Sequence, residues 1–379
     1  MKLAFFQRLD QAGGGSRASL RVTLQTLRDQ RPDWNLTLVT QSNGPLSQQA
    51  AKWQITLRQS AFPRFRKLWE RLAFWRVCRH LADELGGLGF EGVLSNEWVT
   101  APHAFEVARR LQVPAMSYVR DFAALQRGKK YQLHRMNRLL CVCESMRQGL
   151  IQVGYDPERV RTVYDPVLRP LLREPDSQVL GQISQAMAAD RWLLYLGRIS
   201  PRKNQLEAVQ VLQHLREITG QRWGLLLAGD ADENYAAAVD QAVSAAGLVG
   251  AVLQLGLIQE PGWLFELVEA SIMTSKSEGL ARVLIESLLC GKPSFAFPVD
   301  GLEDIFGEDL PCFVTEQRDP LELAQKIAVA MADSNHFRDR TETLGAMLEA
   351  RHSKLSHVAA FEQAVSFRTF PNVSPSLLP

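Results

Sequence analysis

Short β-branched or apolar runs alternate with longer segments of helical periodicity, and this alternation occurs twice along the chain. Parallel strands need long crossover connections, usually helices, so the pattern predicts parallel sheets flanked by helices. The expected strands are 3–6, 36–40, 92–94, 115–119, 139–142 and 160–163 in the first half, and 192–196, 224–228, 252–255, 272–274, 294–297 and 313–314 in the second. Helices are expected at 205–219, 235–246, 264–270, 283–290, 321–331 and 353–367.

The chain length of 379 residues fits two such domains better than one. The segment 165–191 holds three prolines and little periodic apolar content, as a linker does. We therefore expect two doubly wound α/β domains, over residues 1–180 and 181–352, facing each other across a cleft. Residues 353–379 would add a last helix, which could pack back on the first domain, and a tail.

Charge is distributed unevenly along a nearly neutral chain. The whole sequence has a formal charge of +2, but residues 1–180 hold 27 of the 43 basic side chains and only 16 of the 41 acidic ones. The first half therefore carries a formal charge of +11 and the remainder −9. A basic first domain predicts an anionic ligand or surface for that domain.

Several classes of protein are disfavoured by composition. No apolar run of about 18 residues is present, and the first residues have too short an apolar run and too early a charge for a signal peptide. The five cysteines are odd in number and lie mostly in apolar surroundings, as reduced thiols do, and they lack metal-ligand spacing. We expect a cytoplasmic protein, which could also associate peripherally with the inner face of a membrane, and no metal site.

A glycine loop follows the first expected strand. Gly14 and Gly15 precede a segment that can form a helix, and backbone N–H groups at a helix start suit a phosphate or carboxylate. The pattern G-x-G-x-x-G is missing, so a nicotinamide-binding site is disfavoured, and a plain tight turn explains the glycines equally well.

Two carboxylates, Glu278 and Glu286, lie where a strand loop is expected to become a helix near Leu280. The free N–H groups and the positive dipole end of such a helix, flanked by two carboxylates, could hold a polyhydroxylated anionic ligand. An acidic helix start with an ordinary capping role is the alternative.

A second motif, upstream of these carboxylates, is cationic. Arg198 and Lys203 follow the first strand of the second half, five residues apart. A guanidinium and an ammonium suit a diphosphate, with about 1.5–3 kcal/mol for each charge-assisted hydrogen bond. Charged residues that serve only surface solubility are the alternative.

Taken in this order, the motifs resemble those of the retaining, nucleotide-sugar-dependent glycosyltransferases of family 4, which have the GT-B fold of two Rossmann-like domains. The matching positions are Gly197-Arg198, Lys203-Asn204, Ser275, Glu278-Gly279, Glu286 and Cys290-Gly291-Lys292-Pro293. The resemblance covers residues 190–335. In the first half it rests on the glycine loop, the strand rhythm and Val142-Cys143-Glu144-Ser145.

The resemblance implies a metal-independent hexosyltransferase with no cofactor besides its nucleotide-sugar substrate. Arg198 and Lys203 would hold the donor diphosphate, Glu278 the transferred sugar and Glu286 the ribose. The backbone amides of Gly279, Leu280 and Ala281, with Gly14 and Gly15, would contact sugar and phosphate oxygens. The implied acceptor is a carbohydrate, such as a lipid-linked or cell-surface polysaccharide or lipopolysaccharide precursor.

The chain departs from the family pattern at three positions. Ala281 replaces a frequent glycine, Asp300-Gly301 stands where the family has Gly-Gly, and Arg120-Asp121 stands where many members have a histidine near the reaction centre. Arg120 could meet an anionic acceptor or the diphosphate, or form a structural pair with Asp121. A non-catalytic nucleotide-sugar-binding protein and a sugar-nucleotide epimerase of the same fold therefore stay open. A nucleic-acid partner is not expected, because no binding motif is present.

A basic, aromatic stretch in the first half suggests a membrane surface. Near-helical spacing could place an apolar stripe among lipid headgroups with cations at its flanks. The residues concerned are Arg64, Arg66, Lys67, Trp69, Arg71 and Trp75. Packing of these aromatic rings in the domain core is the alternative. Asp230-Ala231-Asp232 resembles a metal-binding Asp-x-Asp run, but its place after a strand is that of a plain turn.

Overall fold

The computed structural model describes residues 1–10, 15–63, 68–186 and 188–366. Its two compact units are Met1–Pro166 with His352–Pro379, and Val167–Arg351. The first unit ends at Pro166 rather than at residue 180, because the segment that follows packs on the second unit. Val167 is buried in the second unit's core, and a Cβ atom added at Gly262 would lie 2.2 Å from the Leu171 carbonyl oxygen.

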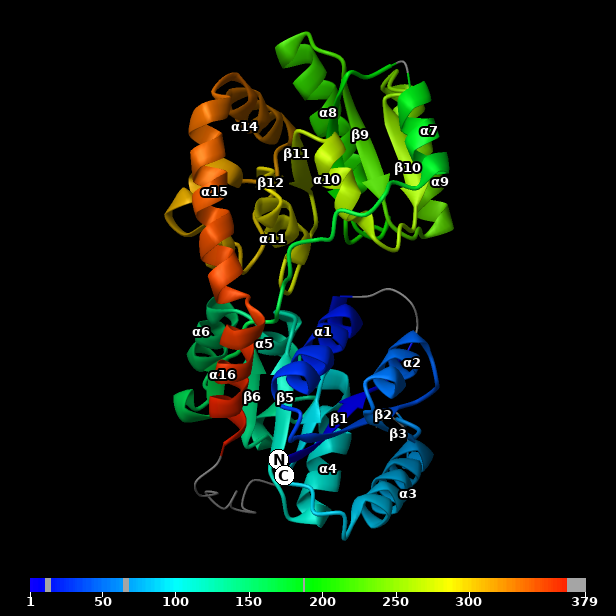
Figure 1. The fold of residues 1–379 in the computed structure, drawn as a ribbon, viewed down its shortest axis with the longest axis vertical. Coiled ribbons are helices and arrows are strands. Elements are labelled where there is room, and N and C mark those ends of the chain that lie inside the picture. Colours follow the sequence, from blue (N-terminus) through cyan, green and yellow to red (C-terminus); the bar gives the residue numbers. More distant parts are fainter. Residues whose placement is uncertain (11–14, 64–67, 187, 367–379) are drawn as a thin grey trace. The chain divides into compact units, whose positions relative to one another are not determined.

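The first unit contains a parallel sheet of seven strands in the order β3-β2-β1-β4-β5-β6-β7 (Figure 1). The strands are β1 (Lys2–Gln7), β2 (Asn35–Thr40), β3 (Thr56–Gln59), β4 (Gly92–Ser95), β5 (Ala115–Val119), β6 (Arg138–Cys141) and β7 (Val160–Thr162). The helices are α1 (Gly15–Gln30), α2 (Pro45–Lys52), α3 (Leu68–Leu85), α4 (Ala101–Leu111), α5 (Ala123–Arg127), α6 (Glu144–Gln152) and α16 (Lys354–Val365). β1 is buried from Leu3 to Gln7, as expected of a central parallel strand covered on both faces.

The second unit contains a smaller parallel sheet in the order β10-β9-β8-β11-β12 (Figure 1). Its strands are β8 (Arg191–Leu196), β9 (Trp223–Ala228), β10 (Val252–Gly256), β11 (Ala270–Met273) and β12 (Ser294–Ala296). Its helices are α7 (Ser177–Gln185), α8 (Gln205–Thr219), α9 (Glu233–Ala245), α10 (Leu264–Leu267), α11 (Arg282–Leu289), α12 (Glu303–Phe306), α13 (Leu310–Phe313), α14 (Pro320–Ala332) and α15 (Ser334–Arg351). Two doubly wound parallel sheets confirm the predicted fold class.

Two expected elements differ from the structure, and some observed elements were not expected. The strand expected at 313–314 is wrong: Phe313 ends helix α13, where its ring packs on Phe295, Phe306 and Phe337, and Val314 forms only an isolated bridge. The helix expected at 264–270 ends at Leu267, because β11 begins at Ala270. The edge strand β3 was not expected, since its sequence Thr-Leu-Arg-Gln has no apolar run.

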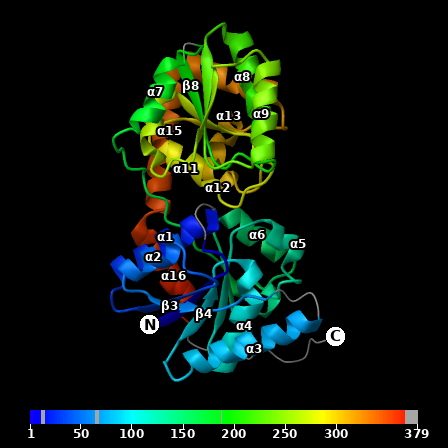
Figure 2. The same ribbon diagram turned by 90° about the vertical axis from the view of Figure 1, so that its right-hand side faces the viewer.

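The last helix, α16, completes the core of the first unit. Phe361 is fully buried, with its ring centroid 6.2 Å from that of Phe5, 6.1 Å from Trp34 and 6.3 Å from Tyr118. Figure 2 shows α16 beside α1. The first unit is therefore built from two stretches of the chain, which are separated in sequence by the second unit.

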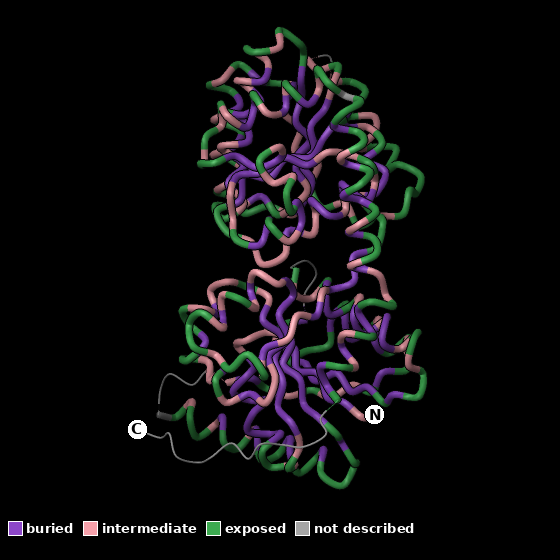
Figure 3. Tube along the Cα trace, turned by 90° about the vertical axis from the view of Figure 1, so that its left-hand side faces the viewer, coloured by how far each residue is buried: buried purple, intermediate pink, exposed green. Residues whose placement is uncertain are grey.

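Burial follows the sheets. Figure 3 shows the buried segments concentrated in the strands of both units, with exposed segments along the outer helices and loops. Within the described residues, no helix combines the length and hydropathy needed to span a bilayer.

Candidate active site

The two motif-bearing loops of the second half lie at the carboxyl ends of neighbouring strands in the second sheet. Residues 197–204 follow β8 and residues 274–281 follow β11, and these strands are neighbours. The chain runs from β8 to β9 and β10 on one side and returns to β11 on the other. In open parallel sheets, ligands bind beyond the carboxyl ends of the strands at such a switch point.

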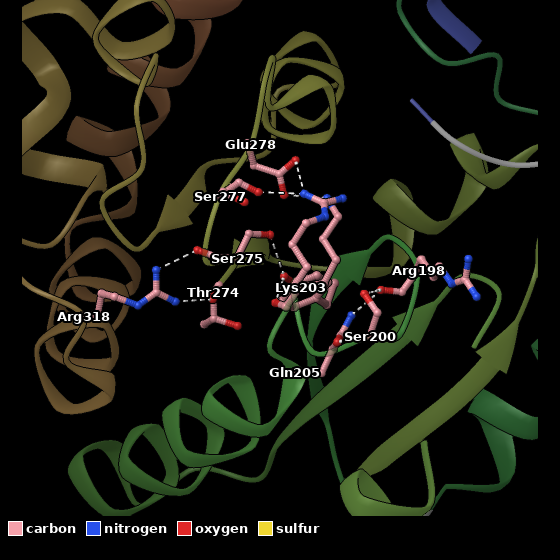
Figure 4. Close-up of polar contacts among 11 residues, drawn as sticks. Arg198, Ser200, Lys203, Gln205, Thr274, Ser275, Ser277, Glu278 and Arg318 are labelled. Carbon is pink, nitrogen blue, oxygen red and sulfur yellow. Dashed lines mark hydrogen bonds and ion pairs between the residues drawn. The ribbon is translucent and has the colours of Figure 1, made fainter. Parts of the chain in front are cut away.

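Glu278 lies between two cations from the β8 loop. Lys203 Nζ is 2.7 Å from Glu278 Oε1, and Arg202 Nη1 is 3.3 Å from Oε2 (Figure 4). The Glu278 side chain is only 9% exposed, whereas that of Arg202 is half exposed. Arg202 also donates to the Ser277 carbonyl oxygen at 2.6 Å. Arg202 was not among the expected site residues, and the structure shows that it belongs to the site.

The two cations keep Glu278 ionised. Burial by itself would raise the pKa of Glu278, but the charges of Lys203 and Arg202 outweigh it and hold the pKa below its usual value. The cluster of two cations and one carboxylate has a net positive charge. An anionic group would therefore find a partner here without displacing Glu278 from both cations.

Arg198 stands apart from this cluster. Its side chain is 59% exposed and extends away from Glu278, with Nε 3.6 Å from Asp230 Oδ2 (Figure 4). Its main chain is held by Gln205, which donates to the Arg198 carbonyl oxygen at 3.0 Å and accepts from the Ser200 amide at 3.2 Å. The structure therefore brings Lys203 and Glu278 together and leaves the Arg198 side chain accessible.

Buried hydroxyl groups join the β8 loop to the β11 loop. The Tyr195 hydroxyl donates to the Lys203 carbonyl oxygen at 2.5 Å and lies 3.2 Å from Ser275 Oγ. Thr274 Oγ1 donates to the Asn204 carbonyl oxygen at 2.8 Å. A tyrosine within a buried strand needs a hydrogen-bond partner for its hydroxyl, and this need is the sequence signal that could have identified Tyr195.

The start of α11 presents backbone amides beyond Glu278. The helix begins at Arg282 rather than near Leu280, and no described residue accepts a hydrogen bond from the N–H groups of residues 279–281. Glu286 lies one turn along α11, where its Oε1 is 3.6 Å from Arg282 Nη2. Burial raises the pKa of Glu286, against the opposing attraction of Arg282.

The switch point of the first sheet, between β1 and β4, holds a polar network. Gly14 lies outside the described residues, and Gly15 begins α1. Ser16 Oγ donates to Glu97 Oε1 at 2.6 Å, and Gln7 Nε2 donates to the same oxygen at 2.9 Å. Asn96, fully buried, donates to Gln7 Oε1 at 2.6 Å. The start of α1 is thereby fixed to the ends of β1 and β4.

Arg120 has a different partner from the one expected. The predicted alternative of an Arg120–Asp121 pair is wrong, because the guanidinium of Arg120 is paired with the buried carboxylate of Asp165 and its Nε donates to Asn96 Oδ1 at 3.0 Å. Asp121 is exposed and instead accepts from the Ala123 amide at 2.7 Å. Arg120 directly follows β5, and its buried ion pair with Asp165 connects the carboxyl end of this strand to the segment after β7.

Helix α3 carries exposed aromatic side chains. Arg64, Arg66 and Lys67 lie outside the described residues. Trp69 is 64% exposed, Leu72 59% and Trp75 42%, while Phe74 and Cys78 on the opposite face are buried. The exposed face also carries basic side chains at Arg71, Arg76 and Arg79. The alternative in which Trp69 and Trp75 pack into the core is therefore wrong.

Acidic, histidine and cysteine side chains are the usual protein ligands of metal ions. In the described ranges, no three of these residues are arranged to hold a metal ion. Asp230 faces Arg198, and Asp232 caps α9 by accepting from the Tyr235 amide at 3.1 Å. The five cysteines are free thiols. Burial raises the pKa of Cys78 to about 12, as in an unreactive core thiol.

Both units match known glycosyltransferase families. The family described as "Glycosyltransferase Family 4" matches residues 13–167, and "Glycosyl transferases group 1" matches residues 182–344. Anabaena Alr3699/HepE, solved in complex with UDP and glucose, has a TM-score of 0.79 and 18% identity, over 97% of this chain and 100% of that one. This likeness confirms the GT-B fold.

Curated relatives match over shorter stretches. The Vi polysaccharide biosynthesis protein VipC/TviE of Salmonella typhi is 26% identical over 192 residues, which are 49% of this chain and 32% of that protein. The 2-deoxystreptamine glucosyltransferase of Streptomyces kanamyceticus is 28% identical over 141 residues, 37% of this chain and 36% of that protein. Each match spans about a third of the relative's length. From the two family matches and the shared fold, the chain belongs to the group 1, family 4 glycosyltransferases.

Proposed function

We propose that this protein transfers a sugar from a nucleoside diphosphate sugar to an acceptor hydroxyl. The proposed donor is UDP-glucose. The observation that carries the proposal is the contact of Lys203 and Arg202 with Glu278 at the switch point of the second sheet. Lys203, a cation for the diphosphate, and Glu278, a carboxylate for the sugar hydroxyls, are adjacent there. The UDP and glucose bound to HepE, and the glucosyltransferase among the relatives, support the choice of donor.

Each side chain of the site has a distinct role in this proposal. Arg198, with its exposed guanidinium, and Lys203 bind the donor diphosphate, while Arg202 keeps its contact with Glu278. Glu278 accepts hydrogen bonds from the hydroxyls of the transferred sugar. The amides of residues 279–281 bind sugar and phosphate oxygens, and Glu286 binds the ribose hydroxyls.

The proposed reaction retains the anomeric configuration. The acceptor oxygen bonds to C1 of the sugar on the face from which the diphosphate oxygen leaves, through an oxocarbenium-like transition state. The acceptor's hydroxyl proton passes to the departing phosphate oxygen. Arg198, Lys203 and the amides stabilise the negative charge that develops on the leaving nucleotide, so the reaction needs no divalent metal.

We further propose that the acceptor is a lipid-linked or cell-surface polysaccharide or lipopolysaccharide precursor, reached by a protein bound peripherally to the cytoplasmic membrane face. The exposed Trp69 and Trp75 beside arginines on α3 support this, because such a surface suits anionic headgroups. The polysaccharide-biosynthesis relative from Salmonella typhi supports the acceptor class.

Purified protein tests the donor assignment. A thermal-shift screen with uridine, guanosine and adenosine diphosphate sugars should give the largest rise with UDP-glucose or another uridine diphosphate sugar, because ligand binding stabilises the folded state. Glu278→Ala and Arg198→Ala should each lower turnover of that donor at least tenfold. Arg222→Ala is the matched control for Arg198→Ala. Like Arg198, Arg222 is exposed and pairs with an aspartate, with its Nε 3.5 Å from Asp190 Oδ2.

The outcomes separate the alternatives. Unchanged turnover in both site variants would overturn the assignment of these residues. Donor binding without transfer or hydrolysis would identify a non-catalytic binding protein, and a changed donor sugar that stays attached to the nucleotide would identify an epimerase.

A further inference from the structure

Arg318 contacts the loop that carries Glu278, although it belongs to none of the motifs. It lies just before α14, and its guanidinium donates from Nη1 to the Ser275 carbonyl oxygen and from Nη2 to the Thr274 carbonyl oxygen, both at 2.9 Å (Figure 4). A guanidinium is planar and presents its donors in a fixed fork. Two bonds to consecutive carbonyls therefore fix the orientation of this stretch of main chain as well as its position.

The guanidinium is itself held in place. Its Nη2 lies 3.5 Å from Glu207 Oε2 on the first turn of α8, and its Cζ lies 5.4 Å from the centroid of the Phe297 ring. The next residue, Asp319, caps α14 by accepting from the Leu321 amide at 2.8 Å. Arg318 thus connects α8 and the start of α14 to the loop after β11.

The following residues of the same loop, Lys276 and Ser277, are hydrogen-bonded to the β8 loop. Arg202 donates to the Ser277 carbonyl oxygen, and its own carbonyl oxygen accepts from the Lys276 amide at 2.8 Å. Residues 274–277 form no helix or strand, so these contacts replace the regular hydrogen bonds that would order them. Glu278 directly follows this segment.

We propose that Arg318 is a positioning residue that holds Glu278 where it can bind the donor sugar. The inference rests on the proposed function, because that function assigns the sugar to Glu278. Arg318 touches no substrate and acts through the Thr274 and Ser275 carbonyls. A functional side chain must be held within about 0.5 Å of its productive position, and a loop achieves this only with external support.

Hydrogen–deuterium exchange tests the structural step without a donor. In Arg318→Met, amides of residues 272–282 should exchange at least several-fold faster than in the wild type, because both carbonyl contacts are lost. Arg216→Met is the control: Arg216 donates from Nη1 to the carbonyls of Ala188 and Trp223, at the opposite ends of the strands. Equal exchange of the 272–282 segment in wild type and Arg318→Met would overturn the inference.

Donor binding tests the functional step. In Arg318→Met the dissociation constant of UDP-glucose should rise about tenfold, while that of UDP stays within about twofold, because the sugar is assigned to Glu278 and the diphosphate chiefly to Arg198 and Lys203 of the β8 loop. In a Glu278→Ala background the same substitution should have no further effect. Additive losses, or equal weakening of UDP and UDP-glucose, would show that Arg318 acts by another route.

Arg318→Lys separates geometry from charge, because it keeps the cation and removes the fork. It should behave like Arg318→Met, and wild-type binding of UDP-glucose by this variant would overturn the positioning role. If the wild type binds neither UDP nor UDP-glucose, the proposed donor is wrong, whereas the exchange experiment still decides whether Arg318 orders the loop.

Discussion

Glu278 and Glu286 belong to one loop-and-helix segment, yet their surroundings move their pKa values in opposite directions. Lys203 and Arg202 lower the pKa of Glu278, and burial raises that of Glu286. A lowered carboxyl pKa stabilises the folded protein at neutral pH, whereas a raised one costs stability there. The two residues therefore predict opposite effects of the same substitution.

Glu278→Gln should lower the stability of the ligand-free protein at pH 7 by about 1.5–3 kcal/mol, because it leaves Lys203 and Arg202 without their anionic partner. The pKa of Glu278 is lower in the folded than in the unfolded state, so its contribution is complete above pH 4.5 and is lost as the pH falls through the folded-state pKa. The difference in free energy of unfolding from the wild type should therefore shrink below pH 4.5, as denaturant titrations at several pH values would show. A difference independent of pH would contradict this account.

Glu286→Gln should leave the melting temperature at pH 7 unchanged or raise it, because it removes a carboxylate whose ionisation burial disfavours. The same variant should bind UDP-glucose about tenfold more weakly, since the ribose loses a charge-assisted hydrogen bond. Thermal melts and calorimetric titration measure the two effects. A Glu286→Gln variant that melts at a lower temperature than the wild type and binds UDP-glucose equally well would contradict both assignments.

Among the secondary-structure elements, the ends of β8 and β9 approach each other more closely than a side chain allows. A Cβ atom at Gly229 would lie 2.3 Å from the Gly197 carbonyl oxygen and 3.0 Å from the Arg198 amide nitrogen. Gly229→Ala should therefore cost about 1–3 kcal/mol and also weaken donor binding, because it displaces the main chain of Arg198.

Gly181→Ala in α7 is the control for this substitution, since its Cβ would meet no atom within 4 Å. It should stabilise the protein by about 0.5–1 kcal/mol, the usual gain in a helix interior. Chemical denaturation measures both variants. Equal effects at Gly181 and Gly229 would show that crowding at the strand ends is unimportant.

The elements were predictable where the sequence signal is local. The apolar run at 224–228 predicts a buried strand, because parallel strands are apolar on both faces, and the observed strand is Trp223–Ala228. The polar edge strand β3 has no such signal, and the two-residue run at Phe313 was too short to distinguish a strand from a buried helix end.

Contacts between distant side chains were not predictable from motif spacing. The partner of Arg120 lies 45 residues away at Asp165, although Asp121 is adjacent in sequence. The motif supplied Lys203 and Glu278, whose ion pair the structure shows. It did not supply Arg202 or Arg318, because both also donate to main-chain carbonyls of the β11 loop, and such contacts leave no signature in the sequence.

At the scale of the whole molecule, charge and exposed aromatic side chains predict membrane binding by the basic first unit. The protein should float with vesicles that contain anionic lipid at low salt and should dissociate as salt is raised, because each basic residue near the surface contributes about 1 kcal/mol and is screened. Replacing Trp69 and Trp75 with alanine should abolish flotation.

Val249→Ala with Leu257→Ala is the control for flotation, because these two apolar side chains of the second unit are also exposed. This variant should bind vesicles like the wild type. Binding to neutral and anionic vesicles alike would contradict an electrostatic role for α3, and flotation of the Trp69 and Trp75 variant would contradict the role of these two side chains.

The burial of Phe361 against Phe5, Trp34 and Tyr118 has a consequence for how the protein is made. On the ribosome, β1–β7 of the first unit emerge early but lack α16 until Lys354–Val365 have been synthesised. The second unit is contiguous from Val167 to Arg351 and is complete before that. The usual order, in which the N-terminal domain finishes folding first, is therefore reversed. Until α16 has been synthesised, the nascent first unit exposes an apolar surface for chaperones to bind.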